Sequence, residues 1–170
     1  MSCLLFITGG KEIEDECQAH VKTNGKLLTG QIYVSKPGSL GCLHVVHMAL
    51  PPWQAGTKNE ISCLEEGLWA TLEKAMQNGW SSVAISCGTS YPPATAAKTI
   101  VDTVAEFLDE RKSFRIEIRL IDSSDQVVNY LHEMLIKKFG KAAVKIEDTE
   151  QSNSLIASTV PAEITPGITA

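Results

Sequence analysis

The most informative stretch of this chain is Ser81-Ser-Val-Ala-Ile-Ser-Cys-Gly-Thr-Ser-Tyr-Pro-Pro93. Val83 to Ile85 form a short apolar run typical of a buried strand, and a helical pattern follows from about Ala94. The small residues between them leave backbone N–H groups unhindered beside a helix N-terminus, an arrangement that suits a phosphate or another anion. Many strand-to-helix connections have the same local sequence and bind nothing, so the loop needs support from the rest of the chain. The apolar face of the helix comprises Ile100, Val101, Val104, Phe107 and Leu108.

Strands and helices alternate on both sides of this loop. Short apolar or alternating runs predict strands over 31–35, 43–49 and 114–121. Thr57 and Glu60 have the spacing of a capping box, in which each side chain bonds the backbone of the other residue. This order of elements predicts an α/β fold with helices on both faces of a sheet. Apolar stripes at helical spacing predict helices over 11–23, 57–77, from about 94, and from Ser123 or Ser124 to 139.

Size and composition predict one globular domain. The 170 residues suffice for a domain with a core, expected over 1–145, whereas 146–170 has the composition of a linker or disordered tail. A net charge of −5 gives no basic surface for DNA or for an anionic membrane. Five cysteines without a Cys-x-x-Cys pair predict reduced thiols in an intracellular protein, without a zinc site. Met1 to Ile7 is too short to cross a membrane.

Four stretches, in order over about residues 9–140, carry a common pattern. They are Gly9-Gly-Lys-Glu-Ile-Glu-Asp-Glu-Cys-Gln18 with Gly25-Lys-Leu-Leu-Thr-Gly30, Gln31-Ile-Tyr-Val-Ser-Lys-Pro-Gly38 with His44-Val-Val-His-Met-Ala-Leu-Pro51, Ser86-Cys-Gly-Thr-Ser-Tyr-Pro-Pro93, and Ile118-Arg-Leu-Ile-Asp-Ser-Ser-Asp-Gln-Val127. In this order and spacing they resemble the macrodomain family, most closely the tandem macrodomains of the macrodomain-containing poly-ADP-ribose polymerases. The resemblance implies a three-layer α/β/α sandwich around a mixed sheet.

The resemblance also implies a site for ADP-ribose, free or attached to a protein, and no cofactor. The loop would cradle the diphosphate and the distal ribose through backbone N–H groups, while Asp122 and Ser123 would lie at the adenosine end. Family loops carry Ser-Gly, a branched residue, an aromatic residue, Gly and a second aromatic residue. Here Ser90 and Tyr91 occupy the aromatic and Gly positions, or the loop is one residue out of register and Tyr91 is the aromatic residue. The implied loop residues are Ser86, Cys87, Gly88, Thr89, Ser90 and Tyr91.

Part of the family pattern has no counterpart in this chain. The family's Gly-Asp-Ile motif, its strand ending in Asn-Ala-Ala-Asn and its first Gly-rich phosphate loop would all precede Gly9. We therefore expect a macrodomain truncated at its N-terminus, with Met1–Thr8 as a replacement strand or as an extension of the first helix. The open sheet edge of such a domain predicts marginal stability or self-association.

The resemblance favours a module that recognises ADP-ribose or mono-ADP-ribosylated proteins and has no enzymatic activity. Its parent would be a multi-macrodomain ADP-ribosyltransferase-type protein of the nucleus or cytoplasm. The first alternative is a degenerate macrodomain that acts as a protein-interaction scaffold without nucleotide binding. The second is an ADP-ribosyl hydrolase, and the absent Asn and Gly-loop residues argue against it. We expect no direct binding to DNA or to membranes.

Two other groups of residues could carry chemistry. His44 and His47 lie three apart on a strand and therefore on opposite faces, so they cannot bind one metal ion together. Cys87 lies beside a helix N-terminus, which favours a thiolate. The sequence shows no neighbouring His or Asp that would make this cysteine a nucleophile. We expect neither a metal site nor a catalytic residue.

Overall fold

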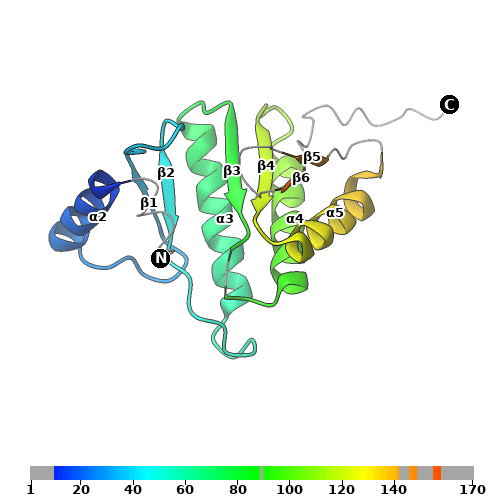
Figure 1. The fold of residues 1–170 in the computed structure, drawn as a ribbon, viewed down its shortest axis with the longest axis horizontal. Helices are drawn as coiled ribbons and strands as arrows, with labels where there is room; N and C mark the ends of the chain where they lie inside the picture. Colours follow the sequence, from blue (N-terminus) through cyan, green and yellow to red (C-terminus); the bar gives the residue numbers. More distant parts are fainter. Residues whose placement is uncertain (1–9, 89, 142–145, 149–154, 158–170) are drawn as a thin grey trace. The chain divides into compact units, whose positions relative to one another are not determined.

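The computed structural model describes residues 10–88, 90–141, 146–148 and 155–157 (Figure 1). The contacts within the chain define two compact units, Met1–Thr71 and Leu72–Ala170. Among the described residues, no helix combines the length and the apolar character that crossing a membrane requires. In the part of the chain that the structure describes, each unit contains one sheet, and the helices with the mixed sheet of the second unit confirm the predicted α/β class.

The first unit begins with a helix and a pair of antiparallel strands. Helix α2 (Lys11–Asn24) confirms the predicted helix over 11–23, and it ends at Gly25, whose φ of 81° suits a residue without Cβ. Strands β1 (Ile32–Ser35) and β2 (Val45–Met48) pair antiparallel over their full length. These are the predicted strands over 31–35 and 43–49, shortened at their ends.

Helix α3 (Glu60–Gln77) begins later than the capping-box pattern predicted. The Glu60 carboxylate, which is fully buried, accepts hydrogen bonds from the backbone N–H groups of Gln54 and Lys58 at 2.7 Å and of Gly56 at 3.3 Å. Thr57 donates its hydroxyl to the Gln54 carbonyl at 2.7 Å. The capping-box prediction is therefore wrong: Glu60 is the first helical residue, and its side chain closes the preceding loop.

The second unit contains a mixed four-stranded sheet in the order β3-β4-β6-β5. Strands β3 (Ser82–Ser86) and β4 (Glu117–Asp122) are parallel and lie side by side in Figure 1. Strand β6 (Leu155–Ala157) pairs antiparallel with β4, and β5 (Ile146–Asp148) pairs with β6. Both short strands lie in the segment for which we expected a linker or disordered tail. Pairing of β6 with β4, and of β5 with β6, gives their backbone groups the partners that a disordered tail would lack.

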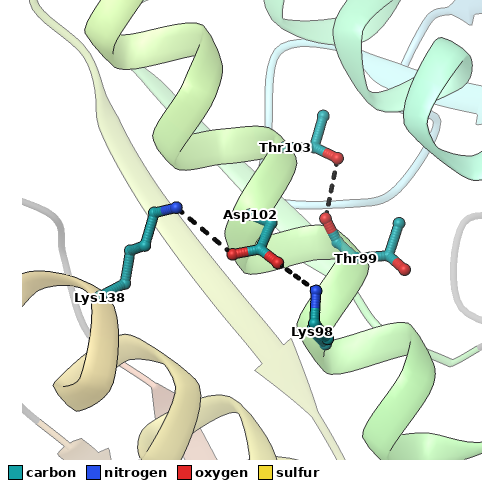
Figure 2. A network of polar contacts seen from close by, with 5 residues as sticks. All are labelled: Lys98, Thr99, Asp102, Thr103 and Lys138. Carbon is teal, nitrogen blue, oxygen red and sulfur yellow. Dashed lines mark hydrogen bonds and ion pairs between the residues drawn. The ribbon is translucent and has the colours of Figure 1, made fainter.

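Helices α4 (Pro93–Glu110) and α5 (Asp125–Phe139) follow β3 and β4 and pack against each other. Their predicted apolar stripes form the core of this unit. At the exposed side of the contact, the Asp102 carboxylate accepts from Lys98 at 2.6 Å and from Lys138 of α5 at 3.5 Å (Figure 2). Exposed ion pairs of this kind contribute little to stability, so the apolar core holds the helices together. The buried members of the two stripes are Ile100, Val101, Val104, Phe107, Val127, Val128, Leu131 and Leu135.

Candidate functional site

Two loops meet where the parallel strands β3 and β4 end. The register pairs Ser86 with Ile121, and the Cys87 N–H extends this ladder by donating to the Ile121 carbonyl at 3.1 Å. Cys87 and Asp122 therefore occupy neighbouring positions at the carboxyl edge of the sheet, the edge at which open α/β sheets bind ligands. The structure thus brings together the two segments that the sequence assigned to one site, 86–91 and 122–123.

The predicted site residues differ in exposure. Cys87, Tyr91 and Asp122 are buried, with 3%, 4% and 9% of their surface exposed. The small residues next to them in the loop and the turn are exposed. The buried side chains of Cys87 and Tyr91 hold the loop in place, while Gly88 and Ser90 between them remain accessible to a ligand. Thr89 lies outside the described residues; the exposed residues are Ser86, Gly88, Ser90 and Ser123.

The backbone donors of the loop are fewer than the sequence suggested. The Cys87 N–H bonds to Ile121, so this donor belongs to the sheet and does not face a ligand. The Gly88 N–H donates to the Ser86 hydroxyl at 3.4 Å, a long bond that a charged acceptor could replace. Pro92 and Pro93 at the start of α4 have no N–H. An anion at this loop would depend on Gly88 and on residues beside it.

The N-termini of α4 and α5 differ in charge. The first turn of α4 contains no acidic residue, and its N-cap, Pro92, provides no side-chain cap. The first turn of α5 contains Asp125, and the Asp122 carboxylate accepts a hydrogen bond from the Ser124 N–H at 2.9 Å. Because a helix N-terminus attracts anions only where acidic side chains do not already neutralise it, an anionic group fits α4 better than α5.

Cys87 is a structural thiol. Burial, together with the negative charge of Asp122, raises the pKa of Cys87 to about 12. The thiol is therefore protonated at neutral pH, in contrast to the thiolate that a helix N-terminus favours, because desolvation outweighs the helix dipole.

A second polar cluster lies in the first unit and was not predicted. His47 is 5% exposed, and its Nε2 lies 2.8 Å from the Ser35 hydroxyl and 3.6 Å from the Cys17 thiol. The Ser35 hydroxyl donates to the Lys36 carbonyl at 2.9 Å, which assigns the hydrogen between Ser35 and His47 to Nε2. Burial lowers the pKa of His47, against the opposing charge of Glu16. A neutral ring that donates to Ser35 cannot act as its base.

The sequence did not predict this cluster, because Ser35 and Cys17 lie 12 and 30 residues from His47 along the chain. Cys17 and His47 each belong to a stretch that carries the family resemblance, but nothing in their spacing joins them. Among the described residues, no group of three His, Cys, Asp or Glu side chains could hold a metal ion.

Comparison with known proteins agrees with this architecture. The family model described as Macro domain matches residues 4–101. An O-acetyl-ADP-ribose deacetylase of Citrobacter rodentium is 32% identical over 108 residues, which are 61% of each protein. One of Enterobacter sp. is 29% identical over 133 residues, which are 76% of this chain and 73% of the relative. The chain thus spans about three fifths of the length of the Citrobacter relative.

The solved structures that match this chain share its fold at low sequence identity. The Oceanobacillus iheyensis macrodomain with ADP has a TM-score of 0.69 at 21% identity, covering 79% of this chain and 73% of that one. A mutant of it with ADPR has a TM-score of 0.70 at the same identity, covering 79% of this chain and 75% of that one. The relatives described above are bacterial deacetylases, so the expected closeness to polymerase macrodomains finds no support.

Proposed function

This chain belongs to the Macro domain family, and on that premise we propose that it binds ADP-ribose, free or attached to a protein. The binding surface would be the carboxyl edge of β3 and β4. Two observations on other proteins support the ligand class: macrodomain structures of the same fold contain ADP or ADPR, and the curated relatives are named for an ADP-ribose derivative.

One observation carries the proposal. The register of β3 and β4 places the loop around Gly88 beside the turn at Asp122, and buried Cys87 and Tyr91 anchor that loop. The diphosphate would lie at Gly88 and the N-terminus of α4, the end without acidic residues. The adenosine end would lie over the turn at Asp122 and Ser123, as the family resemblance implies.

A second candidate is hydrolysis of an ADP-ribose ester, which the names of the deacetylase relatives favour. The described geometry gives it less support than it gives recognition. Cys87 is protonated at neutral pH and is therefore not arranged as a nucleophile. One oxygen of the Asp122 carboxylate, Oδ1, is held by the Ser124 N–H.

Calorimetric titration with ADP-ribose tests the proposal. We expect saturable binding by the native chain and loss of binding in Gly88→Glu, because the new carboxylate would repel the diphosphate. A Cβ at Gly88 meets only the Ser86 hydroxyl, at 3.5 Å, so the variant should fold. Gly41→Glu is the matched control, since Gly41 is exposed and a Cβ there meets nothing within 4 Å.

The outcomes separate three functions. Saturable binding that Gly88→Glu removes and Gly41→Glu keeps supports recognition. No heat up to millimolar ADP-ribose, from a chain with native circular dichroism, contradicts it and leaves the scaffold alternative. Acetate release from O-acetyl-ADP-ribose, at a rate that Gly88→Glu lowers, would establish the hydrolase candidate instead.

A further inference from the structure

The two ends of the candidate site carry different charge. At the α4 end the first turn contains no acidic side chain. At the α5 end two carboxylates, those of Asp122 and Asp125, lie within four residues of each other. Arg119, the cationic side chain of β4, is ion-paired with Glu117. A ligand that spans both ends therefore meets a favourable field for an anion at one end and an unfavourable field at the other.

We propose that Asp122 and Asp125 make this site selective for ADP-ribose over ADP-ribose with a phosphate on the adenosine ribose. The inference rests on the proposed function, because it assumes that adenosine lies over the β4–α5 turn. An added 2′-phosphate would bring about two negative charges to a turn that already has two carboxylates. If the phosphate lies several ångströms from the two carboxylates, their repulsion weakens binding by about tenfold or more, even when water screens the charges.

The two carboxylates would act differently. Asp122 is 9% exposed and its Oδ1 holds the Ser124 N–H at 2.9 Å, so its charge is fixed in position beneath the turn. Asp125 is exposed in the first turn of α5 and contributes charge at the surface. Asp122→Asn removes the charge and keeps an amide oxygen that can accept the same hydrogen bond. Asp125→Asn removes the surface charge and leaves the hydrogen bond between Asp122 and the Ser124 N–H in place.

The experiment compares dissociation constants for three ligands at low ionic strength: ADP-ribose, ADP-ribose 2′-phosphate and ADP-ribose with a phosphate on the distal ribose. For the native chain we expect the 2′-phosphate to bind at least about tenfold more weakly than ADP-ribose. Asp122→Asn and Asp125→Asn should each reduce that ratio by about threefold, and added salt should also reduce it. Asp109→Asn is the control, because Asp109 lies 16 residues from Pro93, about 24 Å along α4.

Each of the following results would overturn the inference. Equal affinity of the native chain for ADP-ribose and its 2′-phosphate would show that the carboxylates do not act on the ligand. An unchanged ratio in both variants would do the same. Relief by the variants of a penalty on the distal phosphate, rather than on the 2′-phosphate, would mean that the ligand lies in the opposite direction. Failure of ADP-ribose itself to bind would reject the proposed function together with this inference.

Discussion

At the scale of single residues, burial decides the chemistry more than sequence neighbours do. His47 illustrates this, because burial lowers the pKa of its ring below that of an exposed histidine, about 6.5. The unfolded chain then binds more protons than the folded chain as the pH falls through that value. Stability must therefore decrease with acidification.

We expect the free energy of unfolding of the native chain to fall between pH 8 and pH 5.5, because the lowered pKa of His47 makes the folded chain bind fewer protons than the unfolded chain. Urea titrations at both values, with circular dichroism as the readout, measure it. His47→Gln should lose stability at pH 8 through its contacts with Ser35 and Cys17 and should show a smaller pH dependence. His44→Gln, at an exposed position, should keep the native pH dependence. An equal change of the unfolding free energy with pH in both variants would contradict the role of His47.

Cys87 is the second case. Its thiol is 3% exposed and has a pKa of about 12, whereas Cys42 is exposed. With iodoacetamide at pH 7.5, we expect Cys42 to be alkylated first and Cys87 to react only when the chain unfolds. Peptide mass spectrometry after timed quenching measures both rates in one sample. Alkylation of Cys87 at the rate of Cys42 would mean that the loop is open and its thiol accessible.

At the scale of elements, packing between β2 and α3 constrains a helix position that propensity would change. Gly67 lies inside α3, and a Cβ added there would lie 2.5 Å from the Met48 sulfur. Alanine in a helix interior normally adds roughly 0.5–1 kcal/mol of stability relative to glycine. Here we expect Gly67→Ala to destabilise the protein by about 1–3 kcal/mol, because the clash outweighs the propensity.

A double-mutant cycle with Met48→Ala checks this cause by urea unfolding. If the clash is responsible, Gly67→Ala should be less costly, or even stabilising, in the Met48→Ala background. An equal cost in both backgrounds would show that the effect arises elsewhere in α3.

Element boundaries show where sequence patterns stop being sufficient. Strand β4 was predicted from 114 but begins at Glu117, because Phe114 packs edge-to-face on Phe107 and its N–H bonds the Arg111 carbonyl. Helix α3 begins at Glu60 because the loop before it turns its backbone N–H groups onto that carboxylate. In both cases the start of the element is set by a contact between side chain and backbone or between two side chains. The periodicity of apolar residues does not reveal such a contact.

At the scale of the whole molecule, periodicity was enough to find most helices and strands, because apolar stripes record which face of each element is buried. The juxtaposition of the Gly88 loop and the Asp122 turn was also predictable, since parallel strands end at one edge. The number of backbone N–H groups that the loop can offer to a ligand was not predictable. Whether the Cys87 N–H faces a ligand depends on Ile121, 34 residues away, and only the register of the sheet reveals it.

The central claim is that ADP-ribose binds at the carboxyl edge of β3 and β4. Amide chemical-shift mapping of the isotope-labelled chain during titration with ADP-ribose tests both the binding and the place. The account predicts saturable shifts that are largest at Gly88, Ser90 and Ser123. Shifts confined to the first unit, for example around His47, or no shifts at millimolar ADP-ribose from a folded chain, would contradict it.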